Sequence, residues 1–150
     1  RAEDIARELD RQRRAPVQAP AAAPAILDPE FSGVLFHEAL GHKLEGQRQR
    51  DPQQSQVFKD LIGKIIIPDF LSLIDDPTMA EYAGAPIHGH YDFDAEGVPA
   101  QRVTLVEKGV LRNFLMSRWP VKGFPRSNGH GRSEAGLRPT GRMAYLIVSA

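Results

Sequence analysis

The strongest chemical signal in the sequence is a pair of histidines with an acidic residue beside the first. His37 and Glu38 are followed by His42, in the pattern H-E-x-x-x-H. A neutral imidazole is a common metal ligand, and a carboxylate close to a metal can take a proton from water. These residue types indicate a metal-dependent hydrolase in which His37 and His42 bind Zn²⁺ and Glu38 is the general base.

The spacing of the two histidines makes a structural prediction. Zinc peptidases commonly carry H-E-x-x-H, which places both histidines on one face of a helix. Here His42 is five residues after His37, so on a regular helix the two side chains would point about 140° apart. We therefore expect the helix to be irregular between them, through a π-bulge eased by Gly41. On spacing alone, an amphipathic core helix that happens to carry two histidines explains the pattern as well.

Three further histidines are candidates for a substitute ligand or a substrate contact. His88 and His90 would point to the same side of a strand, a spacing that can share a metal, although surface positions explain them equally. His130 lies in a glycine-supported loop, Asn128-Gly129-His130-Gly131.

Helix signals dominate the first third of the chain. Residues 1–14 form a predicted helix in which Ile5 and Leu9 share a face, and residues 15–24 form an Ala- and Pro-rich connection. Asp28 is a suitable N-cap with Pro29 at the first helical position, and Gly46 a suitable C-cap. Within that helix, Glu45 would orient a histidine or cap a turn.

The remaining two thirds favour strands and turns. We expect a short helix over Val57–Ile62, buried strands over Ile65–Ile67 and Phe70–Ile74, and a last strand over Arg142–Ser149. Glu107-Lys108-Gly109 predicts a β-hairpin between Arg102–Val106 and Val110–Met116. Asp75-Asp76-Pro77-Thr78 is typical of a turn rather than of an acid–base pair. The pattern predicts one α+β domain over residues 1–150, with the metal helix packed on mixed or antiparallel strands of a core over 25–150.

Composition excludes several classes of function. The 150 residues include 19 basic and 19 acidic side chains, so no net charge favours nucleic acid. No apolar run approaches the length of a membrane span. The absence of cysteine excludes disulfides and thiolate ligands from this sequence and suits a reducing compartment such as the cytoplasm. The missing initiator Met favours a processed or excised piece.

Several motifs in order resemble the TldD/PmbA family, specifically its H-E-x-x-x-H branch. They are residues 34–46 (VLFHEALGHKLEG), 75–78 (DDPT), 93–101 (FDAEGVPAQ), 105–111 (LVEKGVL), 127–132 (SNGHGR) and 139–143 (PTGRM). The resemblance implies a cytoplasmic zinc metallopeptidase that acts on unfolded or short peptides, as a homodimer or as a heterodimer with a second family subunit. It also implies a strand near Ala22–Leu27, and a place near the active site for the loop that holds His130.

The sequence departs from the family in length and in one ligand. Members are considerably longer, and their third zinc ligand is a cysteine in a later section that this sequence does not contain. A catalytic zinc normally has three protein ligands and a water. The alternative function is therefore a non-catalytic subunit or interaction module of a TldD/PmbA-type complex.

Overall fold

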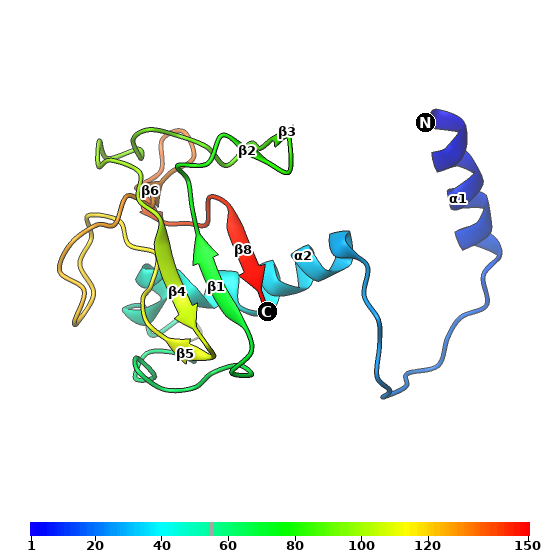
Figure 1. Cartoon of the computed structure of the whole chain (residues 1–150), viewed down its shortest axis with the longest axis horizontal. Coiled ribbons are helices and arrows are strands. Elements are labelled where there is room, and N and C mark those ends of the chain that lie inside the picture. The colour runs from blue at the N-terminus through cyan, green and yellow to red at the C-terminus, as the bar shows by residue number, and fades with distance from the viewer. Residues whose placement is uncertain (55) are drawn as a thin grey trace.

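The computed structural model describes residues 1–54 and 56–150 and has the predicted α+β architecture (Figure 1). Two helices, α1 (Ala2–Arg14) and α2 (Pro29–Ala39), are followed by two 3₁₀ turns, η1 (Gly41–Leu44) and η2 (Gly46–Gln49). Short strands joined by turns and loops make up the rest of the described chain. Figure 1 shows α1 apart from the body of the protein, at the end of an extended connection, and none of its residues is buried.

The main sheet is antiparallel throughout, which decides between the two predicted arrangements. Its order is β5 (Val110–Leu111), β4 (Val103–Glu107), β1 (Ser72–Asp75) and β8 (Leu146–Ser149). Leu73 in the centre of β1 faces Val106 of β4 on one side and Val148 of β8 on the other. Strand β1 thereby joins the β4–β5 pair to the last strand of the chain, β8.

The predicted hairpin is confirmed as β4 and β5. Glu107 pairs with Val110, so only Lys108 and Gly109 form the turn, with φ of 46° and 77°. Two successive positive φ angles are what a type I′ turn requires, and its twist matches that of the strands. The second strand is short, since only Val110 and Leu111 pair as a strand.

The hydrophobic core lies between this sheet and the segment after α2. Leu73, Leu105 and Leu111 from the sheet meet Leu44 and Phe114, and all five are essentially inaccessible to solvent. Burial of these side chains stabilises the fold, since a buried Leu or Phe contributes about 1.5–3 kcal/mol. Leu44 therefore anchors η1, directly after His42, to the sheet.

Three predicted elements are wrong. Ala22–Leu27 forms no strand among the described residues, and Ile26 is fully exposed. Val57–Ile62 is a series of turns rather than a helix, and Ile65–Ile67 makes a single bridge, Ile65 to Val110. Ile65–Ile67 does lie beside β5, with Ile66 N–H donating to Gly109 O at 2.9 Å, but the pairing ends after the one bridge, because a run of apolar residues does not by itself set the length of a strand.

Two predicted boundaries also shift. The strand predicted over Phe70–Ile74 is β1, which begins at Ser72 and ends at Asp75, and Phe70 is exposed. The final strand begins at Leu146 rather than Arg142, because β6 (Gly131–Arg132) and β7 (Thr140–Gly141) form a separate ribbon and Arg142 N–H donates to His130. Another small ribbon joins β2 (Glu81–Tyr82) to β3 (Ala85–Pro86).

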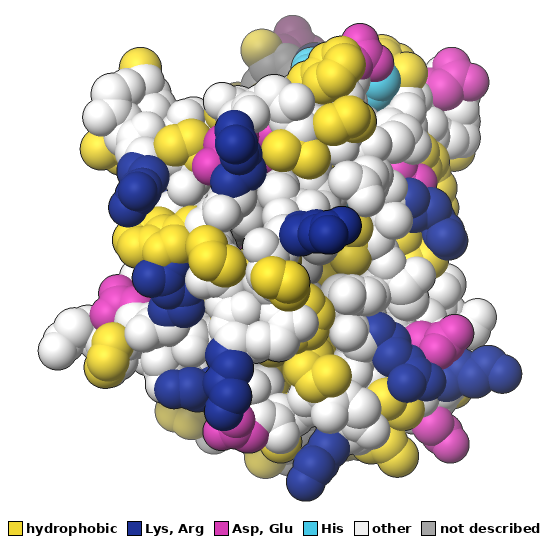
Figure 2. Space-filling view, turned by 90° about the vertical axis from the view of Figure 1, so that its left-hand side faces the viewer, with side chains coloured by type: hydrophobic (Ala, Val, Ile, Leu, Met, Phe, Trp, Pro, Cys, Tyr) yellow, Lys and Arg dark blue, Asp and Glu magenta, His cyan; other side chains and the backbone are white. Residues whose placement is uncertain are grey.

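The surface agrees with the balanced charge. Figure 2 shows lysine and arginine side chains scattered over one face, with hydrophobic and uncharged surface between them, rather than joined in one band. None of the described helices has both the length and the apolar character needed to traverse a bilayer.

Candidate metal centre

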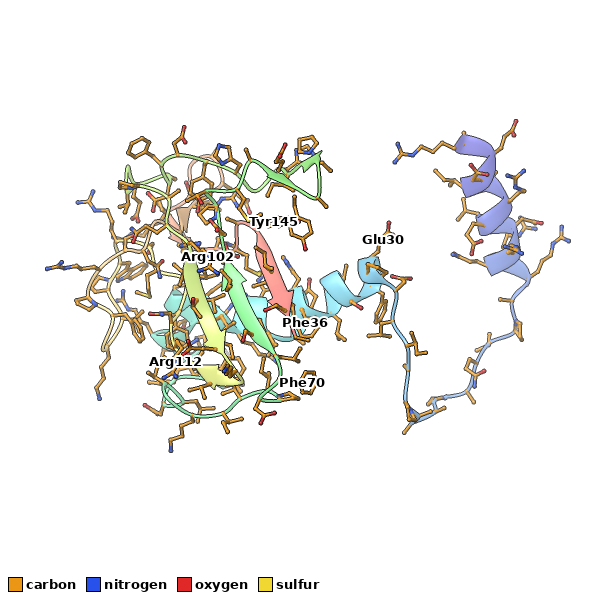
Figure 3. All side chains as sticks on the ribbon, viewed as in Figure 1. Glu30, Phe36, Phe70, Arg102, Arg112 and Tyr145 are labelled. Carbon is orange, nitrogen blue, oxygen red and sulfur yellow. The ribbon has the colours of Figure 1, made fainter. Side chains whose placement is uncertain are left out.

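Helix α2 carries His37 and Glu38 and begins as the sequence predicts. Asp28 is its N-cap, with the side-chain oxygen accepting a hydrogen bond from Phe31 N–H at 2.7 Å, and Pro29 is its first residue. Figure 3 shows Glu30 at the outer end of α2 and Phe36 at the end nearer the sheet. The histidine that follows Phe36 is therefore close to the body of the protein.

The helix is irregular between the two histidines, but not through a π-bulge. It ends at Ala39, Leu40 has φ of −121° and ψ of −50°, and Gly41 begins the 3₁₀ turn η1. The predicted irregularity is confirmed, while the predicted π-bulge and the C-cap at Gly46 are wrong. Because the α-helix ends before His42, the His42 side chain does not have to point about 140° away from that of His37.

Gly41 allows this close-packed break. It is buried, and a Cβ at this position would collide with the Sδ of Met143, which comes from just before β8. Only glycine leaves room for that contact without a shift of the methionine. The segment around Met143 is therefore packed directly against the chain between the two histidines.

His37, Glu38 and His42 converge. One ligand atom from each lies within 4.8 Å of the other two, and the imidazole rings meet edge to face with centroids 4.6 Å apart. Glu38 reaches toward both: its oxygens lie 3.9 Å from His37 Nε2 and 3.8 Å from His42 Nε2. Nitrogens that bind one zinc at roughly 2.0–2.1 Å lie at most about 4.2 Å apart, so small side-chain rotations bring this group to ligating separation. The donor set therefore fits a zinc ion.

Glu45 holds His42 in an orientation suited to a ligand. Its carboxylate is completely buried, and Oε1 lies 3.0 Å from His42 Nδ1. In the tautomer with the proton on Nδ1, the Nδ1–H group donates to this carboxylate. The unprotonated Nε2 then has its lone pair free for a metal, on the side of Glu38 and His37. The expected role of Glu45 in orienting a histidine thus has a matching contact.

The backbone explains why Glu45 is buried. Its neighbours are fixed to Leu115, since Gly46 N–H donates to Leu115 O at 2.8 Å and Leu115 N–H donates to Leu44 O at 2.9 Å. The charge is compensated by Arg48, whose Nε lies 2.9 Å from Oε2, and by Arg142 at 3.5 Å from Oε1. A buried carboxylate with these partners is satisfied rather than stranded.

A cavity of about 520 Å³ opens beside the two histidines. Its wall joins α2 and η1 to the segment around β6 and β7, far away in the sequence. The charged and sulfur-containing lining residues are Glu45, Arg132, Glu134, Arg138, Arg142 and Met143. The space is large enough for a few residues of an extended peptide.

The other predicted histidines lie elsewhere. His88 is exposed in a turn after β3, and His90 Nδ1 lies 3.1 Å from Pro77 O. The expectation that they share one face of a strand is wrong, because neither residue belongs to a strand. In the described chain, the group of converging ligand atoms contains neither of them, nor His130.

His130 instead forms a buried pair with Asp75. Both side chains are completely buried, with His130 Nε2 3.1 Å from Asp75 Oδ1, and Nδ1 is 2.9 Å from Asn128 O. The same Asp75 oxygen accepts hydrogen bonds from the backbone N–H groups of Ala144 and Tyr145, next to Met143. The pair thereby fixes the segment that packs against Gly41.

Sequence reasoning missed the place of Asp75. The Asp-Asp-Pro-Thr run does contain turn chemistry, because Asp76 Oδ1 accepts hydrogen bonds from Thr78 N–H at 3.0 Å and from its hydroxyl at 2.6 Å. Asp75, however, is the last residue of β1 and is directed into the protein. The sequence did contain a signal for this position: side chains two residues apart on a strand point to the same face, so Asp75 shares the buried face of Leu73.

Tyr91 lies near the same pair. Its hydroxyl donates to Gly129 O at 2.8 Å. Burial raises the pKa of Tyr91 well above its ordinary value, and the nearby charges of Asp75 and Asp94 act in the same direction while Arg132 opposes them. The phenol is therefore a hydrogen-bond donor at neutral pH and an anchor for the glycine-rich loop.

Known proteins match this chain over most of its length. The profile of the PmbA/TldA metallopeptidase C-terminal domain matches residues 20–150. A metalloprotease of Methanocaldococcus jannaschii is 37% identical over 124 residues, which are 82% of this chain and 26% of the relative. A protein of Saccharolobus solfataricus named zinc metalloprotease TldD homolog is 32% identical over 96 residues, 64% of this chain and 20% of the relative. The chain thus spans about a quarter of the length of these relatives.

A solved structure shares the fold. The crystal structure of TldE from Thermococcus kodakarensis superposes with a TM-score of 0.61 at 20% identity, covering 77% of this chain and 25% of that one.

Proposed function

The chain belongs to the PmbA/TldD metallopeptidase family, and we propose that it supplies two zinc ligands, His37 and His42, and the general base, Glu38, for peptide-bond hydrolysis. The observation that carries the proposal is the convergence of these three side chains beside a cavity that both histidines line, with Glu45 Oε1 at 3.0 Å from Nδ1 of His42. The substrates we propose are unfolded or short peptides, since a cavity of about 520 Å³ has room for a few residues of a peptide chain.

Each residue has a separate task in this chemistry. Zn²⁺, when bound, acts as a Lewis acid that polarises the substrate carbonyl and makes water more acidic. Glu38, whose side chain is 64% exposed and lies 3.8 Å from His42 Nε2, takes the proton from the attacking water and passes it to the leaving amine. Glu45 keeps His42 in one tautomer, so the ligand does not have to reorganise during the reaction.

The two histidines leave the zinc short of one protein ligand, which the family resemblance assigns to a cysteine beyond this sequence. We propose that the working enzyme is a cytoplasmic assembly of family subunits that completes the site. A non-catalytic subunit is the competing proposal, because two histidines are fewer protein ligands than a catalytic zinc normally has. The intact His37–Glu38–His42 group and its buried support by Glu45 argue against it, because a scaffold has no need of either.

Hydrolysis of an unfolded protein substrate tests the proposal. The chain, within the assembly of family subunits that completes the site and supplied with Zn²⁺, is incubated with denatured casein and with a short fluorogenic peptide, beside Glu38→Gln and a surface control, Glu107→Gln. We expect cleavage by the wild type and the control, and none by Glu38→Gln, although this variant retains zinc. Absence of cleavage by the zinc-loaded wild type, or equal cleavage by Glu38→Gln, would favour the non-catalytic role.

A further inference from the structure

The wall of the cavity opposite the histidines carries an excess of available positive charge. Arg132 and Arg138 lie on this wall, and in the described residues neither has a carboxylate within ion-pair distance. Arg132 donates one of its five N–H groups, from Nη1 to Met143 O at 2.9 Å, so further donors remain. Of the two acids that line the cavity in the described chain, Glu45 is already occupied by His42, Arg48 and Arg142, which leaves Glu134 as the one acid beside Arg132 and Arg138.

A second hollow, of about 320 Å³, continues this wall. It shares Thr140 with the first cavity and is lined by Arg50, Trp119 and Asp51. The carboxylate of Asp51 is hydrogen-bonded to its own turn, since it accepts hydrogen bonds from Gln53 N–H at 2.9 Å and from Gln54 Nε2 at 3.2 Å. Among the described residues, Arg50 is therefore a third guanidinium without an acidic partner at this surface.

Trp119 draws two of these cations together. The guanidinium carbon of Arg50 lies 4.1 Å from the centre of the indole ring, and that of Arg138 lies 4.2 Å from it. Cation–π contact holds each side chain in a defined place, but it brings two like charges close to one another. An anion bound beside the ring relieves this repulsion and meets planar donors suited to a carboxylate.

We propose that Arg50, Trp119 and Arg138 form a subsite for a carboxylate of the bound peptide, so that the cavity selects peptides with a negative charge a few residues from the scissile bond. The carboxylate can come from an Asp or Glu side chain or from the peptide's C-terminus. The role of this subsite in substrate selection rests on the proposed function. Binding of a peptide to the subsite can nevertheless be measured without hydrolysis.

Trp119 is the only tryptophan in the chain, and it is 37% exposed, so its fluorescence reports on the subsite directly. Two pairs of tryptophan-free peptides are titrated against the intact chain, with and without Zn²⁺. In the first pair, with both ends blocked, a central Glu is exchanged for Gln. In the second pair, the central residue is Gln and the C-terminus is either a free carboxylate or an amide. The pair that shows the charge preference identifies the source of the carboxylate.

We expect the charged peptide of at least one pair to bind roughly 10–100-fold more tightly than its neutral partner, because hydrogen bonds to charged groups have that worth. The preference should fall several-fold at high salt. Arg50→Gln and Arg138→Gln should abolish it, while Arg126→Gln, an exposed arginine outside both hollows, should preserve it.

Three outcomes overturn the subsite: equal binding within both pairs, no binding of any of the peptides, or a preference that survives in both arginine variants. The last outcome would place the carboxylate on the zinc instead, and its dependence on added Zn²⁺ would show this. Because the titrations require no cleavage, their result decides the subsite alone, and the proposed function is decided separately by the cleavage assay with Glu38→Gln.

Discussion

Replacement of Glu45 by Gln tests how the protein prepares His42 as a ligand. The side chains have the same size, so the substitution removes a charge and one acceptor oxygen without opening a cavity. In the wild type, one carboxylate oxygen faces His42 Nδ1 and the other accepts from Arg48 and Gln47. The remaining amide oxygen is drawn to Arg48, which turns the amide NH₂ toward His42.

That orientation has a direct consequence for the histidine. An NH₂ group opposite Nδ1 requires Nδ1 to accept, which moves the imidazole proton to Nε2, the nitrogen that faces Glu38 and His37. Loss of such a supporting carboxylate typically weakens metal binding about 10–100-fold. The fold should lose only about 1–2 kcal/mol, since Arg48 and Arg142 are 28% and 45% exposed and can be hydrated.

The assay is competition for Zn²⁺ with a chromophoric chelator, together with urea unfolding. Glu107→Gln is the matched control, because Glu107 is exposed and its ion pair with Arg112 at 3.0 Å lies away from the cavity. A folded Glu45→Gln variant whose zinc affinity equals that of the wild type would refute the argument. Zinc affinity that falls equally in the control would also refute it, because the effect would then be one of net charge.

Three further predictions concern the support of the site. Asp75→Ala should reduce the free energy of unfolding by about 3–5 kcal/mol, because it leaves a buried His130 without its partner; urea unfolding measures this, and a loss below 1 kcal/mol would contradict it. Gly141→Ala should lower stability by about 1–3 kcal/mol, since its Cβ would collide with the backbone of Leu115; an unchanged melting temperature would show that the ribbon moves freely. Burial raises the pKa of Tyr91 in the folded chain above that of the unfolded chain, which is about 10. The contribution of Tyr91 to the free energy of unfolding is therefore complete below about pH 10 and is lost as the pH rises further. Stability measured at pH 8 and pH 11 should therefore fall less in Tyr91→Phe than in the wild type, and parallel pH profiles would count against the assigned cause.

Local signals in the sequence predicted those parts of the fold that local chemistry determines. Asp28-Pro29 specifies the start of α2, and Lys108-Gly109 specifies a two-residue hairpin turn, because N-capping and positive φ act within a few residues. The apolar run Ile65–Ile67 misled for the complementary reason. Whether such a run becomes a strand depends on a neighbouring strand, and here only Ile65 finds one.

The candidate site was predictable in its ligands but not in its support. The five-residue interval required a break in the helix, yet the choice of a 3₁₀ turn over a π-bulge depends on Met143 packing against Gly41, about a hundred residues away in sequence. Asp75 and His130 are 55 residues apart and meet only because β1 lies beside the segment that leads into β8. Contacts of this kind are set by topology, which single residues do not encode.

Zinc content is the most direct measurement of the central claim, that His37 and His42 bind one metal ion. The wild type, His37→Ala, His42→Ala and the control His88→Ala are equilibrated with micromolar free Zn²⁺ and analysed by elemental mass spectrometry. We predict close to one zinc per chain in the wild type and in His88→Ala, and a large loss in both site variants. A wild type that holds no zinc, or site variants that hold as much as the wild type, would contradict the account.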